Sequence, residues 1–388
     1  MYVVIQLIKE VFMKNKKNVF TIVLLLILLQ IGIIAQTINV SVENKMSIER
    51  FETVSFNLTN SIHFECENLK VFNSNGEQIV SQLFDSNMDG NIDQIIFQDK
   101  FKPNEVKTYS IKESLEIVEI ESKVFASFIE GREDIAWESN KVAFRMYGEP
   151  LKLEVDNGID VWSKRVENLV VTKWYKEERE GQSYHVDNGE GADFFSVGKS
   201  LGCGGSALFN GDTLVQSGVY SRYEILDNGP IRTRFLLTFE FNVEGKKIVE
   251  SKIIFIDANS YLNKILTHYS EIPDGYKFVA GLVIRDGLSI NTDSENSIIS
   301  LWGKISKNES DGELGTAVIF NSSDNVKIIE KRNHLMLGTQ AKNGEALTYY
   351  TGAGWSKQSD SFNKDSWINY LMLYKERLRN PLTTTLVN

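Results

Sequence analysis

The strongest constraint on the fold comes from three consecutive runs, residues 232–242, 248–257 and 261–270, which are rich in β-branched, aromatic and other apolar residues. Short turns separate the runs, at Glu244-Gly245 and at Ala258-Asn259. Runs of this composition between tight turns are typical of antiparallel β-strands. Helical periodicity is rare in the rest of the chain, so the sequence predicts an all-β protein.

The other strand-like segments divide the chain into two parts. Short runs between Asn, Gly, Asp and Ser turns fill residues 36–125, which we interpret as a small immunoglobulin-like sandwich. Longer runs fill residues 126–388 and predict a large antiparallel β-sandwich with one or two short helices. One helix is expected near the end of the chain, where Ser366 precedes a stripe of apolar residues and Pro381 stops it.

Residues 1–35 have the layout of a secretory signal peptide. Lys14, Lys16 and Lys17 precede a long apolar run at residues 19–34. A permanent membrane anchor is the alternative, but the run is short for a membrane span. We therefore expect a periplasmic or secreted protein whose mature chain has no stable membrane insertion.

The net charge limits the classes of binding partner, and the two cysteines limit the possible disulfides and zinc sites. The formal net charge is −10, and binding to phosphates needs a basic face, so we expect no nucleic-acid partner. A single basic pocket can still bind an acidic sugar against the global charge. Cys66 and Cys203 lie far apart and lack zinc-site spacing, and the sequence leaves open whether they pair. It also leaves the oligomeric state open.

An acidic turn at residues 85–93 is similar to the first half of an EF-hand calcium loop. Asp85, Asn87, Asp89 and Asp93 supply oxygen ligands at alternate positions, with glycine in the sixth. The twelfth position is isoleucine, so the bidentate carboxylate of that loop is missing. A structural calcium ion is one interpretation of this pattern, and a hydrogen-bonded acidic turn is the other.

Residues 184–193 form the segment richest in groups that transfer protons or bind ions. Tyr184, His185, Asp187 and Glu190 lie among glycines that disfavour both helix and strand. Catalytic groups often lie on loops, so we interpret Tyr184, His185 and Glu190 as catalytic candidates and Asp187 as a substrate-binding one. A solvated turn and a metal site built from the acids are the alternatives.

Further candidates lie outside this loop, most of them in predicted strands. Arg145 follows an apolar stretch and requires an anion there, either an internal carboxylate or that of a substrate. His268 is also surrounded by apolar residues, so it is either a buried structural histidine or part of a cleft. The remaining substrate-binding candidates are two polar side chains and two aromatic faces suited to sugars: Tyr220, Arg232, Trp137 and Trp302.

Four segments carry a family resemblance. They read WESNKVAFR at residues 137–145, GIDVW at 158–162 and YHVDNGEGAD at 184–193, followed by a glycine-rich stretch at 198–205. They resemble the exported bacterial family registered as domain of unknown function 4861, whose N-terminal part the acidic turn also fits. With the predicted strands, the resemblance implies a mutarotase-like supersandwich. It also implies polysaccharide degradation, since one similar protein type is an ulvan oligosaccharide dehydratase.

We therefore expect an exported carbon–oxygen lyase that acts on uronic-acid oligosaccharides by β-elimination. A dehydratase of the ulvan type removes water from a non-reducing-end uronate and leaves a 4,5-unsaturated sugar. Arg145 would neutralise the substrate carboxylate and so acidify the C5 proton. His185 or His268 would remove that proton, because imidazole titrates near neutral pH.

The proton donor and the residue that orients the histidine complete the expected site. Tyr184 or Tyr220 would protonate the leaving oxygen, and Glu190 or Asp187 would orient the imidazole. This chemistry requires no cofactor, and the substrate is the only partner it implies. A chain-cleaving polysaccharide lyase, a glycoside hydrolase and a non-catalytic carbohydrate-binding protein are the alternatives.

Overall fold

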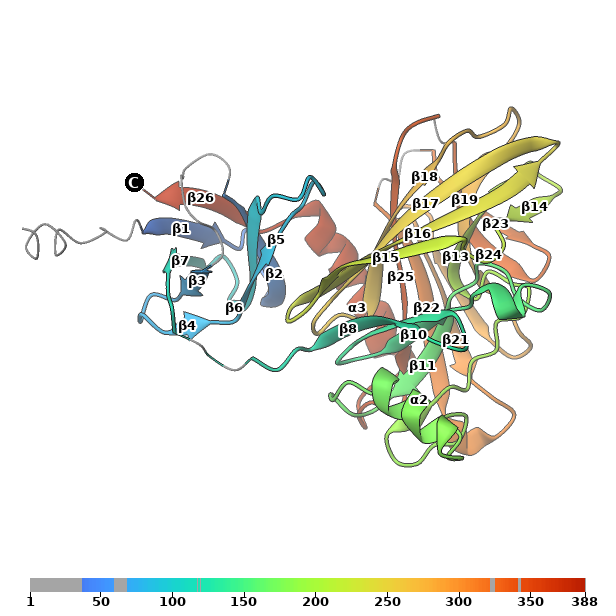
Figure 1. Ribbon diagram of the computed structural model, residues 1–388, viewed down its shortest axis with the longest axis horizontal. Helices are drawn as coiled ribbons and strands as arrows, with labels where there is room; N and C mark the ends of the chain where they lie inside the picture. Colours follow the sequence, from blue (N-terminus) through green and yellow to red (C-terminus); the bar gives the residue numbers. More distant parts are fainter. Residues whose placement is uncertain are drawn as a thin grey trace, which may run out of the picture.

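The computed structural model describes residues 37–387 except 59–67, 117, 119, 322–324 and 341–342. The predicted signal peptide and Cys66 lie outside the described residues. The described chain is mostly antiparallel β-sheet, as predicted, with two α-helices, α2 (Val171–Arg179) and α3 (Lys364–Arg379) (Figure 1). Neither helix is long and apolar enough to span a membrane.

The small domain consists of a five-stranded and a three-stranded sheet around a core that includes Val40, Val71 and Phe97. The strands, in sheet order, are β26 (Thr383–Val387), β1 (Ile38–Glu43), β7 (Val106–Glu113), β3 (Leu69–Phe72) and β4 (Gln78–Ile79), then β2 (Arg50–Asn57), β6 (Gln94–Phe101) and β5 (Ser81–Phe84). The C-terminal strand β26 pairs with β1. The last strand, assigned to the large domain from sequence, therefore completes the small one.

The large domain is built on an eight-stranded antiparallel sheet that contains the three long runs identified in the sequence. Its order is β15 (Arg222–Asn228), β16 (Arg232–Val243), β17 (Lys246–Asp257), β18 (Leu262–Tyr269), β25 (Leu347–Trp355), β22 (Glu313–Phe320), β21 (Ile298–Lys304) and β20 (Ser289–Asp293). In β16, β17 and β18 buried residues alternate with more exposed ones, because side chains of a strand point to opposite faces in turn.

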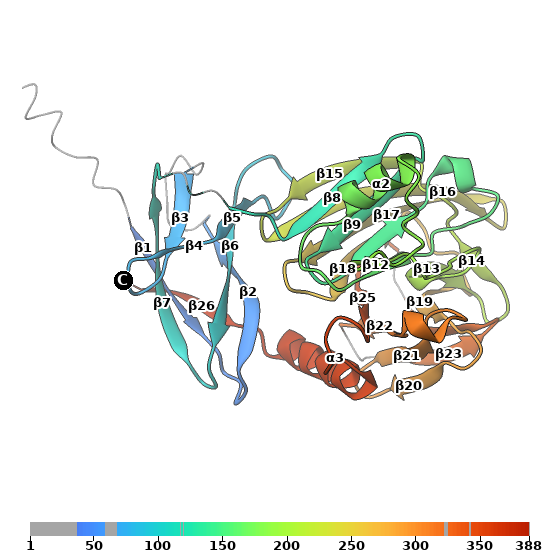
Figure 2. The ribbon, with the colours of Figure 1, turned by 90° about the horizontal axis from the view of Figure 1, so that it is seen from below.

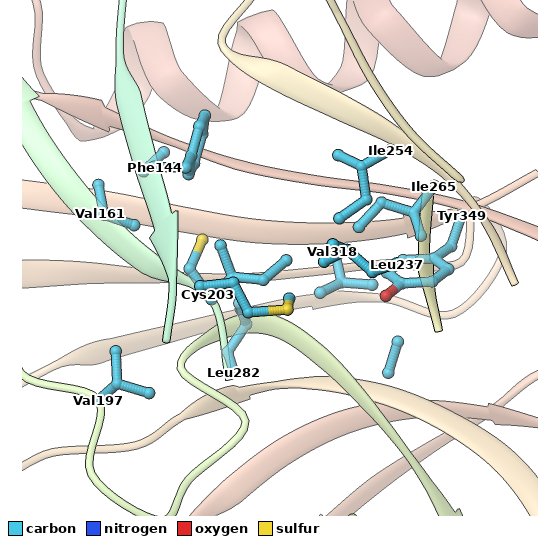
Figure 3. Close-up of a cluster of buried hydrophobic side chains, with 14 of the residues drawn as sticks. Phe144, Val161, Val197, Cys203, Leu237, Ile254, Ile265, Leu282, Val318 and Tyr349 are labelled. Carbon is cyan, nitrogen blue, oxygen red and sulfur yellow. The ribbon is translucent and has the colours of Figure 1, made fainter. Parts of the chain in front are cut away.

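Two five-stranded sheets pack against the inner face of the eight-stranded sheet. One runs β12 (Gly191–Ala192), β11 (Asp160–Lys164), β10 (Ala143–Met146), β9 (Asp134–Ser139), β8 (Val124–Ile129), and the other β14 (Leu214–Gln216), β13 (Cys203–Phe209), β19 (Lys277–Val283), β24 (His334–Thr339), β23 (Lys327–Lys331). Phe144, Cys203, Leu237 and Val318 meet in the core between these sheets (Figure 3). The architecture is therefore a β-sandwich, as predicted.

The two helices cover different outer faces of this sandwich (Figure 2). Helix α2 packs Trp174 and Tyr175 against Trp162 on the outside of the β8–β12 sheet. Helix α3 packs Trp367 and Leu371 against the outside of the eight-stranded sheet. Its N-cap is Asn363, and the predicted cap Ser366 forms the other half of a capping box.

Candidate functional site

A buried ion-pair cluster lies on the α2 side of the β8–β12 sheet, centred on Arg145. Strand register places Arg145 directly opposite Asp160 on β11. Its Nε and Nη2 donate to Asp160 Oδ2 at 3.0 and 2.6 Å, and Nη2 also donates to Asp193 Oδ2 at 2.7 Å. The Arg145 side chain is only 3% exposed. Its anion is therefore internal, and it does not present a free cation to a substrate carboxylate as the sequence suggested.

Two carboxylates share this one guanidinium, and this sets the electrostatics of the cluster. Burial raises the pKa of Asp193 well above its usual value, and the neighbouring Asp160 raises it further, against the lowering effect of Arg145. Burial alone would lower the pKa of Arg145, but Asp160 and Asp193 raise it well above the usual value. Tyr147 donates to Asp160 Oδ2 at 2.9 Å, which completes the shell around that carboxylate.

His185 lies at the solvent edge of the cluster. Its Nδ1 is 3.0 Å from the backbone carbonyl oxygen of Asp193 and 3.5 Å from the Asp193 carboxylate. A carbonyl oxygen can only accept, so Nδ1 carries the proton and Nε2 is the unprotonated nitrogen of the neutral ring. The His185 side chain is 55% exposed, so this basic nitrogen is accessible to a ligand.

Tyr184 bridges His185 and the buried cluster. Its ring lies 4.6 Å from the imidazole, centroid to centroid, and its hydroxyl accepts a hydrogen bond from Arg145 Nη1 at 2.9 Å. Tyr184 is buried, with 4% of it exposed, and no acceptor for its phenolic proton is found among the described residues. Burial raises the pKa of Tyr184, which keeps the phenol protonated at neutral pH.

Arg132 is an accessible cation beside Tyr184. Its side chain is 41% exposed and its guanidinium carbon lies 5.7 Å from the centre of the Tyr184 ring. It pairs with Asp134 at 3.5 Å, and its charge lowers the pKa of the neighbouring Asp193 carboxyl. Arg132 thus has the position that the sequence analysis gave to Arg145.

Glu190 and Asp187 do not orient His185, contrary to the prediction. Glu190 accepts hydrogen bonds from Lys173 at 2.7 Å and Trp174 at 3.1 Å, and the bond from Lys173 lowers its pKa. Asp187 pairs with Arg165. Asp193 takes the orienting position instead, because the loop turns back on β12 and places its backbone carbonyl beside the imidazole.

The other predicted site residues lie away from this cluster. Trp137 is fully buried and donates to Asn263, Trp302 packs under α3 and donates to Glu313, and neither presents a face to a sugar. Tyr220 is buried, and its hydroxyl donates to the carbonyl of Glu133. These three are structural, because burial and an internal partner satisfy each polar atom.

His268 and Arg232 lie on the outer face of the eight-stranded sheet. His268 is half-buried on β18, where it pairs across the strands with Ser251, and its neighbours Thr267 and Tyr269 point into the core. Arg232 forms two hydrogen bonds with Asp257, at 2.6 and 2.8 Å. Both residues are thus on the α3 side of the sandwich, whereas His185 is on the α2 side.

The acidic turn at residues 85–93 is hydrogen-bonded within itself. Asp85 accepts from the backbone N–H groups of Met88 and Gly90 at 2.7 and 2.8 Å, and Ser86 donates to Asp93 at 2.6 Å. These are the contacts of an Asx-type turn. In the described part of the chain, no three His, Cys, Asp or Glu side chains are arranged to hold a metal. A structural calcium ion at this turn stays a prediction.

The site therefore combines residues that the sequence indicated with residues that it did not. Arg145, Tyr184 and His185 were candidates and lie together. Asp160 and Arg132 were not candidates; Asp160 was part of the GIDVW segment, but only strand register brings it opposite Arg145.

Replacing Asp193 by asparagine should change how stability depends on pH. A carboxyl with a raised folded-state pKa contributes stability that is fully present below about pH 4 and is lost as pH rises through the folded pKa. Asparagine does not titrate, so the free energy of unfolding of the variant, relative to the parent, should rise as the pH increases above about 4. Urea titrations at several pH values measure this difference. If the free energies of unfolding of the parent and the variant changed equally with pH, the raised pKa of Asp193 would be contradicted.

Comparison with known proteins identifies the family of this chain. The model of the family described as Domain of unknown function (DUF4861) matches residues 42–384. An uncharacterized protein named P7 from Formosa agariphila is 29% identical over 373 residues, covering 89% of this chain and 93% of P7.

Solved structures share the fold. An alpha-mannosidase from Enterococcus faecalis aligns with a TM-score of 0.53 at 7% identity, and a protein in the glycosyl hydrolase family 38 from the same organism with 0.53 at 8%. They cover 91% of this chain, which spans just under half of their length (46% and 47%). At this identity the likeness shows the fold alone.

Proposed function

The chain belongs to the DUF4861 family, and we propose that it is an exported carbon–oxygen lyase that acts on uronic-acid oligosaccharides, most like a dehydratase. The observation that carries the proposal is the accessible imidazole of His185, whose Nδ1 proton is held by the Asp193 carbonyl at 3.0 Å. This contact leaves Nε2 as a base that faces solvent. A buried cluster of ion pairs lies behind the imidazole and supports its position before substrate binds.

In the proposed elimination, one residue removes the C5 proton and another residue protonates the leaving oxygen. His185 Nε2 takes the C5 proton of the uronate, the C5–H electron pair forms the C4=C5 double bond, and the C4–O bond breaks. Tyr184 donates its phenolic proton to the departing oxygen, which leaves as water. Arg145, whose Nη1 is hydrogen-bonded to Tyr184, stabilises the charge that remains on the phenol oxygen.

Arg132 is the residue that would bind the substrate carboxylate. The guanidinium would offset the negative charge of the substrate carboxylate, which otherwise opposes removal of the C5 proton. Replacing Arg132 by glutamine should raise KM for a uronate-ended oligosaccharide about tenfold or more, because charged hydrogen bonds contribute about 1.5–3 kcal/mol. Arg222→Gln is the matched control, since Arg222 is 76% exposed on the edge strand β15. Equal KM changes in both variants would remove Arg132 from substrate binding.

The reaction can be followed directly with oligosaccharides that end in glucuronic or iduronic acid. A conjugated uronate absorbs in the ultraviolet, and mass spectrometry should show the loss of one water per chain. Shortening of the chain together with the absorbance would identify a chain-cleaving lyase instead. Binding without any absorbance change would identify a carbohydrate-binding protein and contradict the proposal.

A further inference from the structure

A second pocket lies between the two domains, on the opposite side of the sandwich from His185. Its volume is about 260 Å³, slightly below the range of about 300–1,000 Å³ for drug-sized ligands. The outer face of the eight-stranded sheet forms its floor, α3 forms one wall, and β2 and β6 of the small domain form the other. In Figure 2, α3 leads from the large domain to the small one, where β26 joins β1.

Polar contacts between the domains hold the pocket in shape. Thr53 donates to Asp257 at 2.8 Å, and Gln98 donates to the carbonyl oxygen of Ala258 at 2.8 Å. Arg50 donates to the carbonyl oxygen of Asn380 at 2.7 Å, where α3 ends. These bonds link the two domains at the pocket, so it does not depend on a ligand for its shape.

Two cations in the pocket form no salt bridge with a described residue, although Glu52 and Asp257 are near enough to interact with Arg377 and Lys264 electrostatically. Lys264 projects from β18 over the ring of Phe255, 5.4 Å from its centre, and forms no hydrogen bond or ion pair. Arg377 on α3 also lacks a hydrogen bond or ion pair, and its Nε is buried without an acceptor. The nearby acids are engaged elsewhere, since Asp257 binds Arg232 and Glu52 binds Arg50.

Lys264 has an exposed side chain that lines the pocket, so its ammonium group is available to an anionic ligand. Desolvation by the surrounding protein lowers the pKa of its ammonium group, and the nearby Arg232 lowers it further, against the effect of Asp257. The buried Nε of Arg377 has no acceptor, and a buried donor without a partner carries a free-energy cost. An anionic ligand that reached both Lys264 and Arg377 would remove this cost.

Several of the other residues that line the pocket are aromatic. Tyr370 and Tyr374 lie one turn apart on α3, Tyr350 lies beside Lys264 on the sheet floor, and Phe51 of β2 is 45% exposed. Aromatic faces next to cations suit a ligand that has both an apolar ring face and a negative charge.

We propose that this interdomain pocket binds an acidic sugar residue of an oligosaccharide, with its carboxylate or sulfate at Lys264 and Arg377 and its ring against the tyrosines. This inference goes beyond the proposed reaction, because the pocket is separate from His185 and contains no base–acid pair. It would give the protein a second point of attachment to a charged polysaccharide. Attachment at two points raises the effective concentration of substrate at the catalytic residues.

The test uses the full mature chain and 4-nitrophenyl β-glucuronide, with the β-glucoside as its uncharged counterpart. Hydrogen–deuterium exchange should show that the glucuronide protects peptides from β2 and α3 and that the glucoside protects them much less. Lys264→Met and Arg377→Met should each weaken this protection, with the apparent Kd raised about tenfold. Arg379→Met is the matched control, since Arg379 lies on the same helix but contacts Asn296 and Glu376 instead.

Peptides from residues 181–193 report on the His185 region in the same experiment, so failure of the reaction and failure of this pocket are distinguishable. Unchanged protection of β2 and α3 in both methionine variants would overturn the inference. Equal protection by glucoside and glucuronide would overturn its anionic part. Competition with sodium sulfate distinguishes a carboxylate site from a sulfate site. If low millimolar sulfate displaces the glucuronide, the pocket prefers sulfated sugars, which supports the proposal.

Discussion

His185→Ala should lower kcat about 10²–10⁴-fold, the usual contribution of a positioned general base. The melting temperature should stay nearly unchanged. The His185 side chain is 55% exposed, and among the described residues its ring contacts the Asp193 backbone, the Asp193 carboxylate and the Tyr184 ring. Removing it leaves no cavity in the core, so the mechanisms that destabilise proteins strongly are absent. Turnover assays and thermal unfolding of the same preparations measure the two effects.

His268→Ala is the matched control for this experiment. His268 was the other candidate base, but it lies on the α3 side of the sandwich, away from Arg145, Tyr184 and Asp193. Its replacement should leave kcat within a factor of about two, since no step of the reaction passes through it. A large loss of kcat in His268→Ala with full activity in His185→Ala would move the active site to the other face. A loss of stability in His185→Ala would make that residue structural.

The sequence indicated the fold class because strand periodicity and turns are local properties. Residues 232–242, 248–257 and 261–270 form β16, β17 and β18 with boundaries shifted by a few residues. The place of residues 383–387 was not predictable in this way. Strand β26 pairs with β1 more than 330 residues earlier, and no local pattern states which edge a strand will join.

Within the candidate site, the high density of reactive side chains in residues 184–193 indicated the right loop but not the contacts that its residues make. Tyr184 and His185 were identified because reactive groups crowd this segment. Glu190 and Asp187 are close to His185 in sequence, yet Lys173 and Arg165 bind them. The contact of His185 with Asp193 is made by a backbone carbonyl, for which side-chain chemistry gives no signal. Arg145 was expected to need an anion, and the choice between an internal and a substrate carboxylate depended on strand register.

Arg145→Met should cause the largest loss of stability, about 3–5 kcal/mol in the free energy of unfolding. Methionine has a similar length but no charge, so the variant leaves Asp160 and Asp193 buried next to each other without a cation. Both carboxylates are almost fully buried, with side-chain exposures of 0% and 1%. The loss arises from these unpaired charges and from the unmade hydrogen bonds of Tyr147 and Tyr184, not from missing volume. Urea titration of the variant and the parent measures it.

The double variant Arg145→Met/Asp193→Asn separates charge from packing. Removing one of the two carboxylates should restore part of the lost stability, because it removes the repulsion between two adjacent buried acids. If the loss came from packing alone, the second substitution would not restore any stability. Arg234→Met provides a comparison, since Arg234 is equally buried but pairs with one partly exposed carboxylate, Asp227. Its loss should be smaller, because Asp227 can regain water when the guanidinium is removed. A larger loss for Arg234→Met than for Arg145→Met would contradict the central role of the shared guanidinium.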